Sequence, residues 1–235
     1  MRVIAIVSRK GGSGKTTLAG HLAVAAEQHG AGPVAIMDTD PQASLTDWWN
    51  ARENDVPLFV QTSFEKLTDD SRKLKEAGIK VLIIDTPPAI SASIETCIDM
   101  ADLVVIPSRP SPHDIRSVAT TVELVEHLGK PLVFVLNAAI GRAKITTEAI
   151  SILSRHGPIA PVLVGQRVDF AASMTDGRTV MELPGKSKSA AEISGLWSYL
   201  DARLNGNVEP LRLSVPRPKT RRIEDSPLFG AAQSV

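Results

Sequence analysis

The sequence predicts an α/β fold in a single domain, a doubly wound, mostly parallel sheet with helices on both faces. Short apolar segments recur along the chain without polar alternation, which indicates strands that are buried on both faces. Segments of helical composition separate these strands, as parallel pairing requires. A glycine-rich loop joins the first apolar segment to the first helical one.

The expected elements follow one another in chain order. Val3–Ser8 is the first buried strand, and Lys15–Gly30 is a helix rich in alanine and leucine that Gly30 ends. Pro33–Asp38 is the second strand, and Ser63–Gly78 is a helix with Ser63 as its cap. Further strands are expected at Lys80–Asp85, Asp102–Pro107, Pro131–Asn137 and Ala160–Gly165, and further helices at about 91–100, 112–128 and 190–204.

The pattern of strands and helices stops near residue 205, so we expect a domain at 1–205 and a flexible basic tail at 206–235. Prolines in this tail preclude a continuous amphipathic helix, which argues against membrane binding.

Lys and Arg total 26, as do Asp and Glu, so the whole chain has no charge bias toward nucleic acid. A single cysteine, Cys97, excludes an intramolecular disulfide and a cysteine-ligated metal cluster. No apolar segment is long enough to span a membrane or to act as a signal peptide, so we expect a cytoplasmic protein.

The stretch SRKGGSGKTT, residues 8–17, lies between the first strand and the first helix. Gly11, Gly12 and Gly14 allow backbone N–H groups to converge on a phosphate, and the helix N-terminus adds its partial positive charge. Lys15 is then placed to reach the β- and γ-phosphates of ATP, and the Thr16 hydroxyl to bind Mg²⁺.

A standard phosphate loop has glycine where this chain has Arg9, and Lys10 adds a lysine at the start of the motif. With this variant, K-G-G-x-G-K-[ST], the chain resembles the ParA/MinD group of deviant Walker A ATPases, which have the P-loop NTPase fold. The resemblance implies an ATP-dependent homodimer in which Lys10 reaches the phosphates of the partner's nucleotide. The alternative is that Lys10 is an ordinary exposed lysine. The expected nucleotide-binding residues in this loop are Lys10, Gly11, Gly12, Ser13, Gly14, Lys15, Thr16 and Thr17.

Carboxylates follow the second strand, in DTDPQAS, and end the strand VLIID. The resemblance implies that Asp40 orients the attacking water and that Asp38 supports the Mg²⁺ shell. Asp85 then corresponds to a Walker B carboxylate, which binds Mg²⁺ through water, and Thr86–Pro88 to the loop that senses the γ-phosphate. The catalytic residues expected are Lys10, Lys15 and Asp40, and those at the metal are Thr16, Asp38 and Asp85.

The similarity to the ParA/MinD group extends to two later segments. Pro110–Asp114 fits a P-x-x-x-D segment of the group, which implies a position near the nucleotide and the dimer interface. Asn137 ends the strand PLVFVLN where members of the group contact adenine. The alternative for Asn137 is a turn residue that ends the strand.

The chain looks most like the small, ParF-type ParA partition ATPases, which begin at the first strand and have no N-terminal operator-binding domain. That resemblance implies non-specific DNA binding, hydrolysis stimulated by a ParB- or ParG-like centromere-binding adaptor, and association with the nucleoid. Basic residues late in the fold are candidates for phosphate contacts, although scattered Lys and Arg residues are also typical of any solvated surface. These candidates are Arg142, Lys144, Arg155, Arg167, Arg178, Lys186 and Lys188, with Arg167 the best of them.

Two other functions stay open at this point. The same ATPase switch could position a protein cargo, such as a chemoreceptor cluster, a carboxysome or a conjugation complex. A dethiobiotin synthetase-type ligase shares the fold, but a self-contained ligase site has no need of a lysine from a second protomer, so Lys10 and DTDPQ disfavour it.

Overall fold

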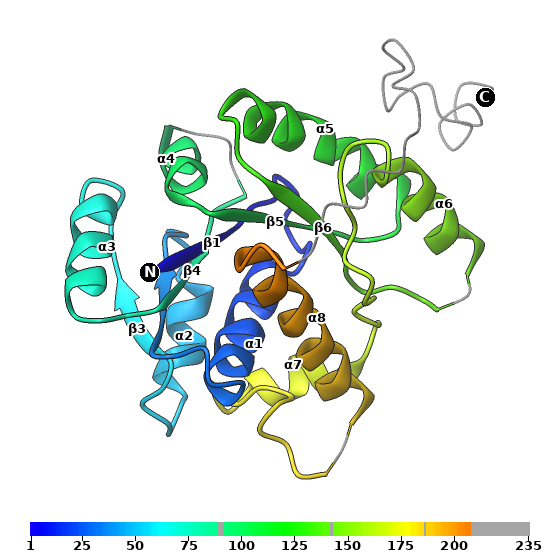
Figure 1. Cartoon of the computed structure of the whole chain (residues 1–235). Helices are drawn as coiled ribbons and strands as arrows, with labels where there is room; N and C mark the ends of the chain where they lie inside the picture. The colour runs from blue at the N-terminus through cyan, green and yellow to red at the C-terminus, as the bar shows by residue number, and fades with distance from the viewer. Residues whose placement is uncertain (89–91, 142, 186, 208–235) are drawn as a thin grey trace.

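The computed structural model describes residues 1–88, 92–141, 143–185 and 187–207 (Figure 1). The expected flexible tail therefore lies, from residue 208 onward, outside the described residues. Arg142 and Lys186, two of the candidate DNA contacts, also lie outside them. No helix in the described part of the chain is long and apolar enough to cross a membrane.

A six-stranded, wholly parallel sheet forms the centre of the fold, in the order β3-β2-β4-β1-β5-β6. Its strands are β1 Arg2–Ile6, β2 Val34–Asp38, β3 Leu58–Gln61, β4 Val81–Asp85, β5 Leu103–Ser108 and β6 Leu132–Leu136. Every residue of β2, β4, β5 and β6 is buried, in agreement with the uninterrupted apolar sequences of these strands.

Helices cover both faces of this sheet (Figure 1). The helices are α1 Lys15–Gln28, α2 Ser44–Asn50, α3 Leu67–Glu76, α4 Ala92–Met100, α5 Pro112–His127, α6 Lys144–Leu153, α7 Val168–Met174 and α8 Lys188–Leu204. Buried side chains of α1, α2, α7 and α8 share one hydrophobic cluster with one face of the strands. Those of α3 to α6 pack on the opposite face. The predicted doubly wound fold is thus confirmed.

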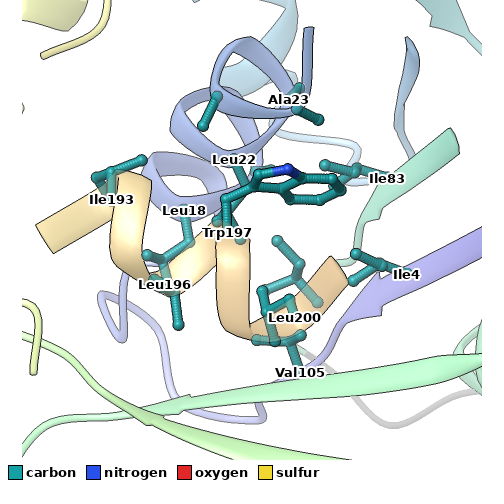
Figure 2. Close-up of a cluster of buried hydrophobic side chains, with 14 of the residues drawn as sticks. Ile4, Leu18, Leu22, Ala23, Ile83, Val105, Ile193, Leu196, Trp197 and Leu200 are labelled. Carbon is teal, nitrogen blue, oxygen red and sulfur yellow. The ribbon is translucent and has the colours of Figure 1, made fainter. Parts of the chain in front are cut away.

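The core beneath α1 and α8 holds the phosphate-loop helix against the sheet (Figure 2). Trp197 of α8 is almost fully buried and lies among Leu18 and Leu22 of α1 and Ile83 of β4. Alanine dominates the remaining buried positions of α1, which lets its backbone approach both layers closely. The start of α1 is therefore fixed relative to the end of β1.

The segment Ala160–Gly165 is not a strand, contrary to the sequence-based expectation. It runs beside β6 and makes only isolated bridges, Phe134 to Ile159 and Ala139 to Gly165. Pro158, whose carbonyl faces β6, has no backbone N–H to donate in that direction, which interrupts the ladder at this point.

The predicted cap at Ser63 is also wrong. The helix α3 begins at Leu67, and no side chain among the described residues caps it. The Ser63 carbonyl instead accepts a hydrogen bond from the backbone N–H of Lys66.

Candidate functional site

The glycine-rich loop connects the carboxyl end of β1 to α1 at the point where strand order reverses. Connections from β1 lead toward β2 and β3 on one side, while β5 and β6 lie on the other. Such a switch point is where open parallel sheets bind ligands. Gly12 and Gly14 have left-handed backbones, with φ of 73° and 97°. Gly14 is the N-cap of α1, and no described side chain caps this helix, so its first N–H groups are left for an anion.

Lys15 is buried, with a relative exposure of 7%, although it carries an ammonium group. Burial lowers the pKa of Lys15, while the nearby carboxylates of Asp85 and Asp40 act in the opposite direction. This lysine therefore lies inside the site, next to the two acidic groups expected there.

Asp85 is 1% exposed, and neither of its carboxylate oxygens has a hydrogen-bond partner among the described residues. Burial, together with the neighbouring charges of Asp38 and Asp40, raises the pKa of Asp85 to about 7. The nearby Thr16 hydroxyl and the Lys15 ammonium oppose this rise. A buried carboxylate without partners fits a site that a bound cation completes.

Asp38 and Asp40 occupy different environments although they are two residues apart. Asp38 pairs in register with Asp85 across β2 and β4 and is buried. Its carboxylate accepts hydrogen bonds from the Thr46 N–H at 3.0 Å, the Thr46 hydroxyl at 2.9 Å and the Asp40 N–H at 3.0 Å. Asp40 is half-buried, and its Oδ1 accepts from the Gln42 N–H at 3.0 Å. Asp38 therefore holds the loop and the start of α2, while Asp40 faces the site more openly.

The described residues hold no cluster of three or more His, Cys, Asp or Glu side chains arranged to bind a metal ion. Mg²⁺ in phosphate-loop proteins is held largely by phosphates, water and one hydroxyl, so the donor set here, Thr16 and Asp85, suits that mode of binding.

Two threonines tie the strand ends together: Thr39, which the sequence analysis did not single out, and Thr86, which it placed only in the loop expected to sense the γ-phosphate. The Thr39 hydroxyl donates to the Asp85 carbonyl at 2.7 Å, and the Thr86 hydroxyl donates to the Ile6 carbonyl at 2.8 Å. Their signal in the sequence is a threonine directly after the aspartate that ends each strand. These bonds hold the ends of β2, β4 and β1 at fixed positions around the loop.

Asn137 supports the glycine-rich loop directly. Its Nδ2 donates to the Ser13 carbonyl at 2.8 Å, and its Oδ1 accepts from the Ala138 N–H at 2.8 Å. A Cβ on Gly14 would lie 2.0 Å from the Asn137 Nδ2. The side chain thus follows the end of β6 and supports the loop, while the expected contact with adenine stays a prediction.

Lys10 lies on the outside of the loop. Its side chain is exposed and makes no ion pair or hydrogen bond with any described residue. The neighbouring Arg9, also exposed, donates from Nη1 to the Thr120 hydroxyl on α5 at 3.0 Å. The two lysines of the loop therefore differ sharply, since Lys15 faces the site and Lys10 faces solvent.

The candidate DNA contacts that the structure describes are spread over several elements. Arg167 pairs with Glu192 at 2.5 Å, and Arg178 pairs with Asp176 at 2.6 Å. Lys144 at the start of α6 is 91% exposed, with Glu148 at 3.7 Å. Lys188 at the start of α8 is exposed, as is Arg155 beyond the end of α6. The two lysines are therefore less committed to carboxylates than the paired arginines are.

A cavity of about 400 Å³ lies away from the glycine-rich loop, between the segments 52–54 and 176–182. Its charged groups are already paired with one another, because Arg52 contacts Glu182 at 2.6 Å and Arg178 contacts Asp176. Self-paired charges give no reason to place the chemistry there, so the loop at the end of β1 is the candidate functional site.

Comparisons with known proteins agree with this geometry. Residues 4–180 match the family described as the CobQ/CobB/MinD/ParA nucleotide binding domain. Protein ParA of Rhizobium radiobacter is 36% identical over 227 residues, covering 90% of this chain and 100% of that protein. The maintenance of carboxysome distribution protein A of Halothiobacillus neapolitanus is 29% identical over 199 residues, covering 80% and 91%. The Mg-ADP complex of MinD from Pyrococcus horikoshii OT3 has a TM-score of 0.72 at 17% identity, covers 88% and 99%, and so shares the fold.

Proposed function

Because the chain belongs to the CobQ/CobB/MinD/ParA nucleotide-binding family, we propose that it is an ATP-dependent dimerisation switch with weak ATPase activity. The dimer binds DNA non-specifically and segregates plasmid or chromosomal DNA, and a centromere-binding partner stimulates hydrolysis. The protein then works in the cytoplasm, associated with the nucleoid. The observation that carries the proposal is the contrast between buried Lys15 and exposed, unpaired Lys10 in one loop.

ATP and Mg²⁺ fit the residues of the loop. The left-handed Gly12 and Gly14 and the uncapped start of α1 suit a polyphosphate. The buried, unpartnered Asp85 beside Thr16 suits a hydrated cation. When bound, Mg²⁺ supplies positive charge that neutralises the phosphate oxygens during transfer.

Within one protomer, Lys15 binds the terminal phosphates and Asp40 orients a water molecule toward them. Little covalent chemistry is required in phosphoryl transfer, so the protein contributes mainly position and charge. The Gln42 N–H holds the Asp40 carboxylate in place, and Asp38 holds the loop that carries it. Lys10 has no counter-charge within its own chain among the described residues, so it is available to the phosphates bound by a second protomer.

Dimerisation tests the role of Lys10. Lys10→Ala is expected to bind ATP but to remain monomeric and inactive, while the exposed Lys75→Ala on α3 behaves as the wild type. Light scattering after size exclusion measures mass with ATP and with ADP, and phosphate release measures hydrolysis. A Lys10→Ala protein that dimerises and hydrolyses ATP normally contradicts the proposed switch.

DNA binding is tested by titration with and without ATP at two salt concentrations. The wild type is expected to bind only with ATP, and less tightly at the higher salt concentration. Lys188→Glu is a better probe than Arg167→Glu or Lys144→Glu, which would place a carboxylate against Glu192 or Glu148. Lys75→Glu serves as the charge-matched control. Binding that does not depend on ATP would refute the switch.

Positioning of a protein cargo is the second candidate function, because a relative that aligns with most of this chain is named for carboxysome distribution. The two functions share the ATPase switch and differ in what it carries. Deletion of the gene separates them, since loss of a plasmid supports partition and displacement of a protein assembly with stable DNA inheritance supports the alternative.

A further inference from the structure

Arg109 lies over the glycine-rich loop. It directly follows β5, which pairs with β1, so both strands end at the same edge of the sheet. A Cβ built on Gly12 would lie 3.6 Å from the Arg109 Nη2, which is ordinary van der Waals contact. The guanidinium group therefore lies beside Gly12 of the loop.

The backbone on which Arg109 is mounted is fixed. Its carbonyl accepts hydrogen bonds from the Ser111 N–H at 2.8 Å and from the Ser108 hydroxyl at 3.2 Å. Pro110 follows it, is buried, and restricts the conformation of the residue before it. Ser111 is the N-cap of α5 and accepts from the Asp114 N–H. These contacts fix the backbone from which the Arg109 side chain extends toward Gly12.

The guanidinium group of Arg109 is exposed and has no ion pair or hydrogen bond within the described part of the chain. By contrast, Arg52, Arg167 and Arg178 each contact a carboxylate at 2.6 Å or less. A fixed arginine without a counter-ion, beside a loop that already holds Lys15, is suited to an anion in that loop. The planar fork of a guanidinium matches two phosphate oxygens at once.

We propose that Arg109 is a further phosphate-binding residue, which contacts the terminal phosphates of the nucleotide held in its own protomer. The inference rests on the proposed function, because it takes the ligand of the loop to be a nucleoside di- or triphosphate. The proposal gives Arg109, which directly precedes the P-x-x-x-D segment Pro110–Asp114, a role in binding the nucleotide. Lys15 then binds the phosphates from inside the site and Arg109 from outside, while Lys10 serves the partner protomer.

The test is calorimetric titration of ADP with Mg²⁺, because ADP occupies the loop without requiring a dimer. Arg109→Ala is expected to weaken ADP binding about tenfold and to reduce its dependence on salt. Arg109→Lys is expected to retain part of the affinity, because lysine keeps the positive charge but cannot bind two phosphate oxygens with a planar guanidinium group. Lys75→Ala, which removes an exposed positive charge on α3, leaves the affinity unchanged. Equal melting temperatures of the free proteins establish that the variants fold.

Wild-type affinity for ADP in Arg109→Ala would overturn the proposal. A loss confined to ATP and accompanied by loss of the dimer would overturn it too, because Arg109 would then act across the interface. The proposed function fails separately, if the wild type binds ADP and ATP but never dimerises. A weakened Arg109→Ala in that case still supports the phosphate contact.

Discussion

Replacing Asp85 with asparagine removes the charge of a buried carboxylate whose oxygens have no hydrogen-bond partner among the described residues. The pKa of Asp85 rises from 3.8 to about 7 in the folded protein, chiefly because of burial. Such a difference corresponds to about 4 kcal/mol of free energy of unfolding. In the absence of Mg²⁺ and nucleotide, ionised Asp85 therefore destabilises the fold.

The raised pKa of Asp85 determines whether its contribution to the free energy of unfolding grows or falls with pH. A raised pKa in the folded state means that the contribution of Asp85 to stability is complete below pH 3.8 and is lost as pH rises toward 7. Between pH 5 and pH 8 the loss amounts to about 2.5 kcal/mol by linkage. The pKa of about 7 already includes the opposing effect of the Lys15 ammonium, so the advantage of Asp85→Asn over the wild type should grow by about 2.5 kcal/mol between pH 5 and pH 8.

Urea denaturation followed by circular dichroism, with EDTA present, measures this difference. Asp85→Asn should unfold at higher urea than the wild type at pH 8, and the gap should shrink at pH 5. Asp55→Asn, a change at an exposed aspartate, controls for the general effect of pH. A gap between wild type and Asp85→Asn that stays constant with pH would refute the reasoning.

Three other changes test the packing around the site. Gly14→Ala forces a Cβ against the Asn137 amide and a side chain into a backbone with φ of 97°, so thermal unfolding should show a loss of about 2 kcal/mol together with weaker ADP binding. Glu182→Ala leaves the buried Arg52 guanidinium without its carboxylate partner, so urea titration should show a loss of about 3 kcal/mol in the free energy of unfolding. An unchanged free energy would mean that water replaces the carboxylate. Trp197→Ala empties the largest side chain of the core beneath α1, with an expected loss of about 4 kcal/mol in chemical denaturation, and a loss below about 1 kcal/mol would show that α8 does not secure α1.

The central strands and long helices were predictable because burial on both faces leaves an uninterrupted apolar sequence. The helix α2, the strand β3 and the helix α7 were missed because each is short and depends on tertiary contacts. In α2, for example, the Trp48 indole donates to the Arg178 carbonyl at 3.1 Å and stacks under Arg52. Arg178 lies 130 residues from Trp48, so the local sequence does not reveal this contact. The helix α6 was missed as well, and we have no single cause for it.

Among the residues of the site, too, some positions could be predicted from the sequence and others depend on contacts between distant segments. Because parallel strands end at one edge, the sequence places Asp38 and Asp85 near the loop, as the structure does. It does not reveal that Arg167 contacts Glu192, which lies 25 residues away and comes close only through the packing of α8. The unpaired state of Arg109 was hidden for the same reason, since charge balance is a property of neighbours in space.

The irregular segment beside β6 has a consequence for assembly. Its backbone exchanges hydrogen bonds with the outer side of β6, from the Phe134 N–H to the Pro158 carbonyl and from the Val164 N–H to the Leu136 carbonyl. Its prolines offer few donors of their own to anything beyond it. Among the described residues, this segment occupies the hydrogen-bonding positions of β6 at Phe134 and Leu136, so a second chain cannot pair with β6 there. Any higher assembly on this side must use contacts between side chains, and salt and nucleotide can change the strength of such contacts.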